Sequence, residues 1–333
     1  MTLENSSSFG ALPPEQNPFY KSEQKKNISR IGLGLLLYSA VAALLQMSFM
    51  TVVYYAFPSF YETEIYNWIL QAVPSYCVAF PLFCLFLSGM PKQAPEKKKL
   101  SGENAIAFLS ISFLLVLVGN LISTALMSGF EFLRGTEISN VVDTYMDSYS
   151  PLLSFALFVV FAPIAEEVMF RKLIIDRLLP YSEWMAVVTS ALLFGLMHGN
   201  FYQFFYATFL GVLFSYVYAR TGKILHTIIM HMIINFTGSI IASTLMELVG
   251  DTNRGLESIT WWDVLAVVYS IALWALVICG GILLFQNFKK LELKKTGNRW
   301  LTLKTQFKLL FSSAGTIVYC VICLLTFISS LFI

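Results

Sequence analysis

The sequence predicts an all-α, polytopic membrane protein with about eight to nine transmembrane helices and a cytoplasmic N-terminus. Of its 333 residues, 57% are hydrophobic and 13% are charged, and the mean hydropathy is +0.69. Several apolar runs exceed the roughly 18 residues that indicate a membrane span. These runs lack the alternation of barrel strands, and lipid offers no partner to an unpaired peptide group, so the spans should be helices.

Nine apolar segments follow one another along the chain. They lie near 31–57, 67–90, 105–128, 150–179, 183–200, 202–219, 223–247, 262–286 and 309–331. Of the 22 Lys and Arg residues, only Arg134 and Arg254 lie in the loops after the third and seventh segments. The others lie in the first 30 residues or in alternate loops. The positive-inside rule therefore places the N-terminus in the cytoplasm and the C-terminus outside.

These segments divide the chain into four parts. Residues 1–30, rich in Ser, Asn, Gln, Pro and Lys, should form a flexible cytoplasmic tail. Transmembrane helices with an external loop follow over 31–149, and a core that carries buried polar groups follows over 150–247. Residues 248–333 should hold the last transmembrane helices and a basic cytoplasmic loop.

The basic loop, at 287–308, has aromatic residues between its Lys and Arg residues. Such a pattern also occurs in nucleic-acid-binding segments, but a position beside the membrane favours contact with anionic lipid. We therefore predict the lipid bilayer as a partner, with anionic lipid at this loop, and no nucleic acid.

Five polar residues interrupt the apolar segments of the core. Glu166 and Glu167 end one apolar run, His198 lies late in another, and His231 and Asn235 lie inside a third. An acid in hydrocarbon costs roughly 2.5 to 3.5 kcal/mol on insertion scales, so intramembrane acids are usually functional. A lone histidine or asparagine is often only an interhelical hydrogen-bond partner. Several such groups in one region of the chain favour a functional site.

Helix geometry predicts that these groups share one level. The turn between these two segments runs from Pro180 to Glu183, and Glu166 and His198 lie at similar distances from its two ends, about 21 Å along an ideal helix. His231 lies about 12 Å past the shallower turn at Lys223. All three groups should therefore be buried nearer the cytoplasmic side.

Helical phase separates the two glutamates, because neighbouring side chains point about 100° apart. We assign Glu166 to the chemistry and Glu167 to an ion pair with Arg171 four residues on, although phase alone does not decide between them. Phe194 precedes His198 by four residues, so its ring should back the imidazole.

Proline should loosen the helix before these acids. Pro163 has no N–H, which frees the carbonyl near Val159. The part of the hairpin between the glutamates and the turn carries Arg171, Lys172, Asp176 and Arg177, and we expect it to project into the cytoplasm.

Two reaction types fit these residues. Glu166 is our candidate for a general base that takes a proton from water, with His198 holding the same water. His231 and Asn235 would donate hydrogen bonds to the oxyanion on an attacked carbonyl. Alternatively, Glu166, His198 and His231 bind Zn²⁺, which lowers the pKa of its own water. Both arrangements hydrolyse an amide without a nucleophilic Ser or Cys.

Three motifs occur in order on successive predicted helices, and together they resemble the CPBP (Abi) family of intramembrane proteases. That family includes the CAAX prenyl endopeptidases and bacterial membrane proteins linked to bacteriocin processing or self-immunity. The resemblance covers about 150–240. The motifs are Glu-Glu-x-x-x-Arg at Glu166 to Arg171, Phe-x-x-x-His at Phe194 to His198, and His-x-x-x-Asn at His231 to Asn235.

The resemblance implies a water-activating base at Glu166 with His198, and oxyanion stabilisers at His231 and Asn235. The ion pair assigned above would support the site. Family members have been described both as zinc proteases and as metal-free glutamate proteases, so the resemblance leaves the cofactor open, with Zn²⁺ as the candidate.

The leading hypothesis is an intramembrane endopeptidase that cuts a hydrophobic or lipidated peptide, or the end of a small membrane-associated protein, from a cavity reached from the cytoplasmic side. The second is a non-enzymatic bacteriocin-immunity or scaffold protein that retains the motifs. A proton-coupled transporter is less favoured, because the polar groups cluster at one depth and no internal repeat is evident. The resemblance suggests the bacterial cytoplasmic membrane as the location.

Overall fold

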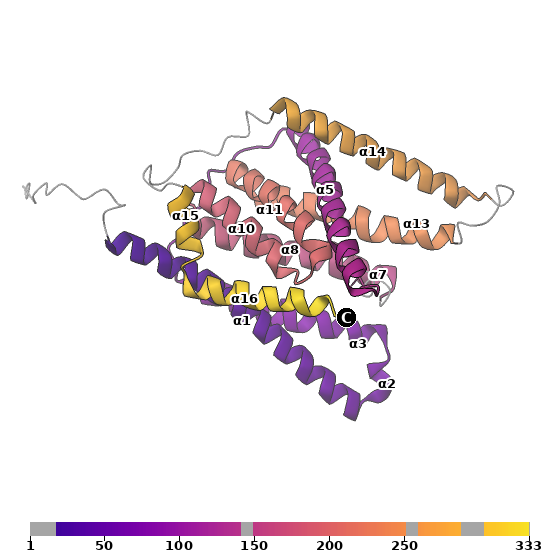
Figure 1. Cartoon of the computed structure of the whole chain (residues 1–333), viewed down its shortest axis with the longest axis horizontal. Helices are drawn as coiled ribbons and strands as arrows, with labels where there is room; N and C mark the ends of the chain where they lie inside the picture. The colour runs from indigo at the N-terminus through magenta and orange to yellow at the C-terminus, as the bar shows by residue number, and fades with distance from the viewer. Residues whose placement is uncertain (1–17, 141–148, 251–258, 288–302, 333) are drawn as a thin grey trace, which may run out of the picture.

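The computed structural model describes residues 18–140, 149–250, 259–287 and 303–332, which form helices without a β-strand (Figure 1). This confirms the all-α prediction. The first helices are α1 (Pro18–Ala56), α2 (Pro58–Tyr61), α3 (Glu64–Ala72), the π-helix η1 (Val73–Ala79), α4 (Phe80–Ser88) and α5 (Gly102–Arg134). The core helices are α7 (Pro151–Ser154), η2 (Phe155–Phe161), α8 (Ala162–Glu167), η3 (Val168–Ile175), α9 (Asp176–Leu178), α10 (Glu183–Met197), α11 (Phe201–Thr221), α12 (Ile224–Asn235), η4 (Phe236–Ile241) and α13 (Ala242–Val249). The last are α14 (Trp261–Asn287), α15 (Leu303–Leu310) and α16 (Ala314–Ser330).

Each predicted span coincides with one helix or with one run of abutting helical segments. Within the described part of the chain, six helices or helical runs are long and apolar enough to cross a membrane: Ser22–Ala56, Glu64–Ser88, Gly102–Arg134, Pro151–Leu178, Ile224–Val249 and Trp261–Asn287. α10 and α16 are apolar but shorter, with 15 and 17 residues. The multi-pass membrane fold is therefore confirmed, while its orientation stays a prediction.

The helices that carry the polar groups lie in the middle of the bundle. Figure 1 shows α8, α10 and α11 together, with α5 crossing them and α14 outside α5. Two glycines let α10 and α11 approach closely. A Cβ on Gly195 would overlap the Thr208 side chain, and a Cβ on Gly211 would lie 2.9 Å from the Ala191 Cα. This packing fixes the end of α10 against α11.

The predicted flexible tail is too long. Residues 1–17 lie outside the described part of the chain, but the helix α1 begins at Pro18. Gln24 and Ile28 are fully buried, and the Ser29 hydroxyl accepts a hydrogen bond from the Gly315 N–H on α16. The polar composition predicted a solvated segment, whereas these side chains pack against the last helix.

The last helices lie on different sides of the bundle (Figure 1). α14 packs on α5, and Gly280 is its one buried residue, whereas α16 packs along α1. Most of the basic loop predicted at 287–308 falls in 288–302, outside the described residues. Its contact with anionic lipid therefore stays a prediction.

A backbone carbonyl before the glutamates lacks its helical partner, as expected, but it belongs to Phe158, one residue before Val159. Pro163 has no N–H for Val159, its α-helical partner, or for Phe158, its π-helical partner. The carbonyl of Phe158, in η2, instead accepts a hydrogen bond of 2.8 Å from the Asn235 amide. A π-helical turn moves the freed carbonyl by one position.

Protein covers most of the charges on the hairpin below the glutamates. Arg171, Asp176 and Arg177 are buried, whereas the Lys172 side chain is 44% exposed. Arg177 donates to the Leu87 carbonyl on α4 at 2.6 and 3.0 Å, and the Tyr218 hydroxyl on α11 donates to Asp176 at 2.7 Å. Neighbouring helices therefore cover three of the four charges, and the projection of this hairpin into the cytoplasm stays a prediction.

Candidate active site

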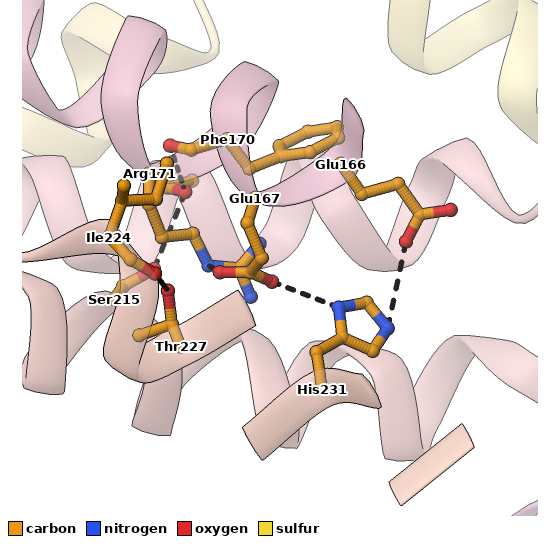
Figure 2. Close-up of polar contacts among 9 residues, drawn as sticks. Glu166, Glu167, Phe170, Arg171, Ser215, Ile224, Thr227 and His231 are labelled. Atoms are coloured by element: carbon orange, nitrogen blue, oxygen red, sulfur yellow. Dashed lines mark hydrogen bonds and ion pairs between the residues drawn. The ribbon is translucent and has the colours of Figure 1, made fainter. Parts of the chain in front are cut away.

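The three polar stretches come together between α8, α10 and α12. Glu166 and His231 point toward each other, with 3.8 Å between Glu166 Oε2 and His231 Nε2 (Figure 2). The Phe194 ring makes edge contacts with two imidazoles, at centroid distances of 4.9 Å to His198 and 5.9 Å to His231. Phe194 thus backs His198, as helical phase predicted, and also touches the second histidine.

Glu167 and Arg171 form the predicted ion pair inside the protein. Arg171 Nε lies 3.1 Å from Glu167 Oε2, and neither side chain is exposed. The guanidinium also lies over two aromatic rings, 4.5 Å from the Phe194 centroid and 5.7 Å from the Phe214 centroid. Cation–π contacts of this kind are worth about 2 kcal/mol or more when desolvated. Phe214, on α11, is a supporting residue that sequence reasoning missed.

Glu167 also binds a histidine, which spacing did not predict. Its Oε1 lies 3.0 Å from His231 Nδ1, on the ring edge opposite to Glu166 (Figure 2). A carboxylate accepts, so Nδ1 carries the proton and the ring orientation is set by this bond. His231 therefore lies between two carboxylates, bound to one and facing the other.

The two glutamates differ in their surroundings. Glu167 is fully buried and bound to both Arg171 and His231. The Glu166 side chain is 18% exposed, and its contact with His231 is longer than a hydrogen bond. Glu166 is consequently the carboxylate with room to bind a further group.

Hydrogen bonding also sets the tautomer of His198. Its Nδ1 lies 2.9 Å from the carbonyl oxygen of Phe194. A carbonyl only accepts, so Nδ1 carries the proton. In the neutral ring Nε2 then has a free lone pair, which suits a group that accepts a hydrogen bond from water.

Asn235 braces the backbone before the glutamates. Its Nδ2 donates to the Phe158 carbonyl at 2.8 Å, which links α12 to η2. An amide nitrogen has two N–H donors. One of them is used by Phe158, and the other is the donor that the oxyanion role requires.

The arrangement leaves the choice of cofactor open. Among the described residues, no three His, Cys, Asp or Glu side chains are grouped closely enough to hold a metal ion. Glu167 occupies Nδ1 of His231, and the Phe194 carbonyl occupies Nδ1 of His198. A histidine bound in this way coordinates a metal through Nε2, so these bonds are compatible with zinc ligation by Glu166, His198 and His231, which stays a prediction.

Comparison with known proteins finds similarity to a family model and to a bacterial membrane protein. Residues 148–237 match the family model described as type II CAAX prenyl endopeptidase Rce1-like. A Bacillus subtilis (strain 168) protein named "Putative membrane peptidase YdiL" is 34% identical over 74 residues. That alignment covers 22% of this chain and only 30% of the relative. No solved structure matches the chain.

The matched segment contains every residue that the sequence singled out. The resemblance inferred from the three motifs is therefore confirmed over about a quarter of the chain. These residues are Glu166, Glu167, Arg171, Phe194, His198, His231 and Asn235.

Proposed function

We propose that this protein is an intramembrane endopeptidase in which Glu166 activates water. The premise is that residues 148–237 are a segment of the CPBP family of intramembrane proteases. The different surroundings of the two glutamates carry the proposal. Glu167 is fully buried in contacts with Arg171 and His231, whereas Glu166 is partly exposed and faces His231 at 3.8 Å. Of these two glutamates, Glu166 is therefore the one that we propose takes a proton from a reactant.

In the proposed reaction, Glu166 takes a proton from a water molecule that also donates to Nε2 of His198. The resulting hydroxide attacks the carbonyl carbon of the scissile peptide bond. Glu166 then passes the proton to the leaving nitrogen, the carbon–nitrogen bond breaks, and water has been added across it. No covalent intermediate with the protein is needed.

The negative charge on the attacked oxygen requires donors. Nε2 of His231 donates when the ring carries a proton on both nitrogens, with the Glu167 carboxylate at 3.0 Å as its counter-charge. Asn235 donates through the N–H that the Phe158 carbonyl does not use. Removing one such donor from an oxyanion hole costs about 10²- to 10³-fold in rate.

The site is built on apolar membrane helices, so we propose a substrate that partitions into the bilayer. A hydrophobic or lipidated peptide, or the end of a small membrane-associated protein, meets this requirement. We place the reaction in the bacterial cytoplasmic membrane, because the similar relative is bacterial.

The test compares peptides released by membranes that contain the wild type, Glu166→Gln or Glu247→Gln at equal levels. Glu247 lies exposed on α13, so its variant controls for the loss of one carboxylate from a membrane helix. We expect a set of peptides that appears with the wild type and with Glu247→Gln and is lost with Glu166→Gln. Identical peptide sets from all three proteins would overturn the proposal and favour a non-enzymatic immunity or scaffold protein.

A further inference from the structure

The turn between α10 and α11 holds a buried asparagine that binds the backbone of His198. His198 is the C-cap of α10, Gly199 has a left-handed φ of +68°, and Asn200 is the N-cap of α11 with an extended backbone. Asn200 is only 4% exposed. Its Oδ1 accepts from the Gln203 N–H at 2.9 Å, and its Nδ2 donates to the His198 carbonyl at 2.8 Å.

These bonds continue along the first turns of α11. Asn200 Nδ2 also donates to Gln203 Oε1 at 2.9 Å, and Gln203 Nε2 donates to the Tyr206 hydroxyl at 3.0 Å. A backbone N–H only donates and a carbonyl only accepts, so the two backbone partners allow a single orientation of the Asn200 amide. The amide therefore acts as a fixed link between the end of α10 and the first turn of α11.

The bond to the His198 carbonyl bears on the imidazole. Carbonyls in the last turn of a helix have no intrahelical partner, and apolar surroundings offer no water to replace one. Without the Asn200 donor the turn must rearrange to satisfy this carbonyl. His198 belongs to the turn, so its ring would move with it.

We propose that Asn200 is a positioning residue for the reaction, which holds His198 so that Nδ1 stays on the Phe194 carbonyl and Nε2 stays available to the attacking water. The effect of Asn200 on catalysis rests on the proposed function. A misplacement of about 1 Å in a catalytic group can cost about 10²-fold in rate. The effect of Asn200 on the His198 ring itself is testable without a substrate.

Asn200 also caps α11, and aspartate separates the two roles. Aspartate is as good an N-cap as asparagine, since its oxygen accepts the same bond from the backbone. It has no N–H for the His198 carbonyl. Asn200→Asp therefore keeps the cap and loses the positioning bond, whereas Asn200→Ala loses both.

A second N-cap supplies the matched control. The Ser182 hydroxyl accepts from the Met185 N–H at 3.3 Å at the opposite end of α10, and Ser182 is also buried. Ser182→Ala removes a cap of α10 without touching the turn at His198. We expect Ser182→Ala to release peptides at the wild-type rate and Asn200→Asp to release them at least about tenfold more slowly. Asn200→Asp should also lower the thermal stability, because a buried acceptor then faces the His198 carbonyl.

The tautomer of His198 gives a direct readout, because the chain has three histidines. In ¹⁵N-histidine NMR of the full chain, with His198 assigned by its loss in His198→Gln, we expect the wild type and Ser182→Ala to have the proton on Nδ1. Asn200→Asp should show averaged nitrogens instead. An unchanged His198 tautomer in Asn200→Asp would overturn the inference, as would release of the Glu166-dependent peptides by Asn200→Asp at the wild-type rate.

The two proposals can fail separately. If Glu166→Gln releases the same peptides as the wild type, the protease proposal fails, while the NMR result still decides the role of Asn200 at His198.

Discussion

Glu167 Oε1 and His231 Nδ1 lie 3.0 Å apart within the bundle, and this bond joins α8 to α12. The other oxygen of the same carboxylate faces Arg171 at 3.1 Å. One side chain thus fixes a histidine of the candidate site and neutralises a cation that has no contact with solvent. We therefore expect substitution of Glu167 to lower both the stability of the fold and the rate of the proposed reaction. Substitution of Glu166 should lower only the rate.

The adjacent glutamates should therefore differ in stability effects. Glu167→Gln leaves the Arg171 charge buried without its partner, a change that typically costs about 3 to 5 kcal/mol. Glu166→Gln removes no short contact and should stay within about 0.5 kcal/mol of the wild type. Unfolding in one detergent measures both variants. Equal stabilities would contradict the different burial of the two carboxylates.

A double-mutant cycle should reveal the coupling of the ion pair. Arg171→Met fills a similar space without charge, and alone it leaves Glu167 without its cation. Combining it with Glu167→Gln removes both charges, so the double variant should be more stable than the sum of the single effects predicts, by about 1 to 3 kcal/mol. Additive effects would show that the two charges do not stabilise each other.

The brace from Asn235 to Phe158 should be sensitive to charge. Asn235→Asp replaces the donor by an acceptor that faces a carbonyl, so we expect a loss of about 1 to 3 kcal/mol and slower peptide release. Ser270→Ala, on the exposed face of α14, removes a polar group from another membrane helix and is the control. Wild-type stability and release in Asn235→Asp would argue against both roles of the amide.

The proposed reaction uses only side chains and water. Peptide release that depends on Glu166 should therefore survive prolonged dialysis against a chelator. Adding Zn²⁺ afterwards should not increase the release. The measurement is the amount of each Glu166-dependent peptide before and after dialysis. Loss on chelation and return with Zn²⁺ would instead favour the alternative in which Glu166, His198 and His231 bind the metal, with each histidine using Nε2.

Much of the fold was predictable because hydrophobic length and helix periodicity are local properties. The nine apolar segments each correspond to helices, and the i, i+4 spacing correctly paired Glu167 with Arg171 and Phe194 with His198. The start of α1 was missed, because a polar composition looks the same whether the side chains meet water or pack against α16.

The inner arrangement of the site was less accessible to sequence reasoning. Spacing along one helix cannot tell which partner a carboxylate selects on another helix, and so the bond from Glu167 to His231 was not foreseen. Because η2 is a π-helix, the carbonyl that Pro163 leaves without a partner is that of Phe158 and not that of Val159. No residue type in the sequence specifies this change of hydrogen-bond register. Asn200, two residues after His198, could have been suspected as an N-cap by its residue type alone.

The shortness of α10 has a consequence for the surrounding lipid. Its 15 residues extend about 22 Å, against a hydrocarbon layer of about 30 Å. Where lipid chains meet this part of the protein, they must shorten, tilt or leave the difference to be covered by neighbouring helices. Eleven of these 15 residues are buried, so neighbouring helices cover most of the difference. The end of α10 that carries His198 should therefore lie within the depth of the bilayer.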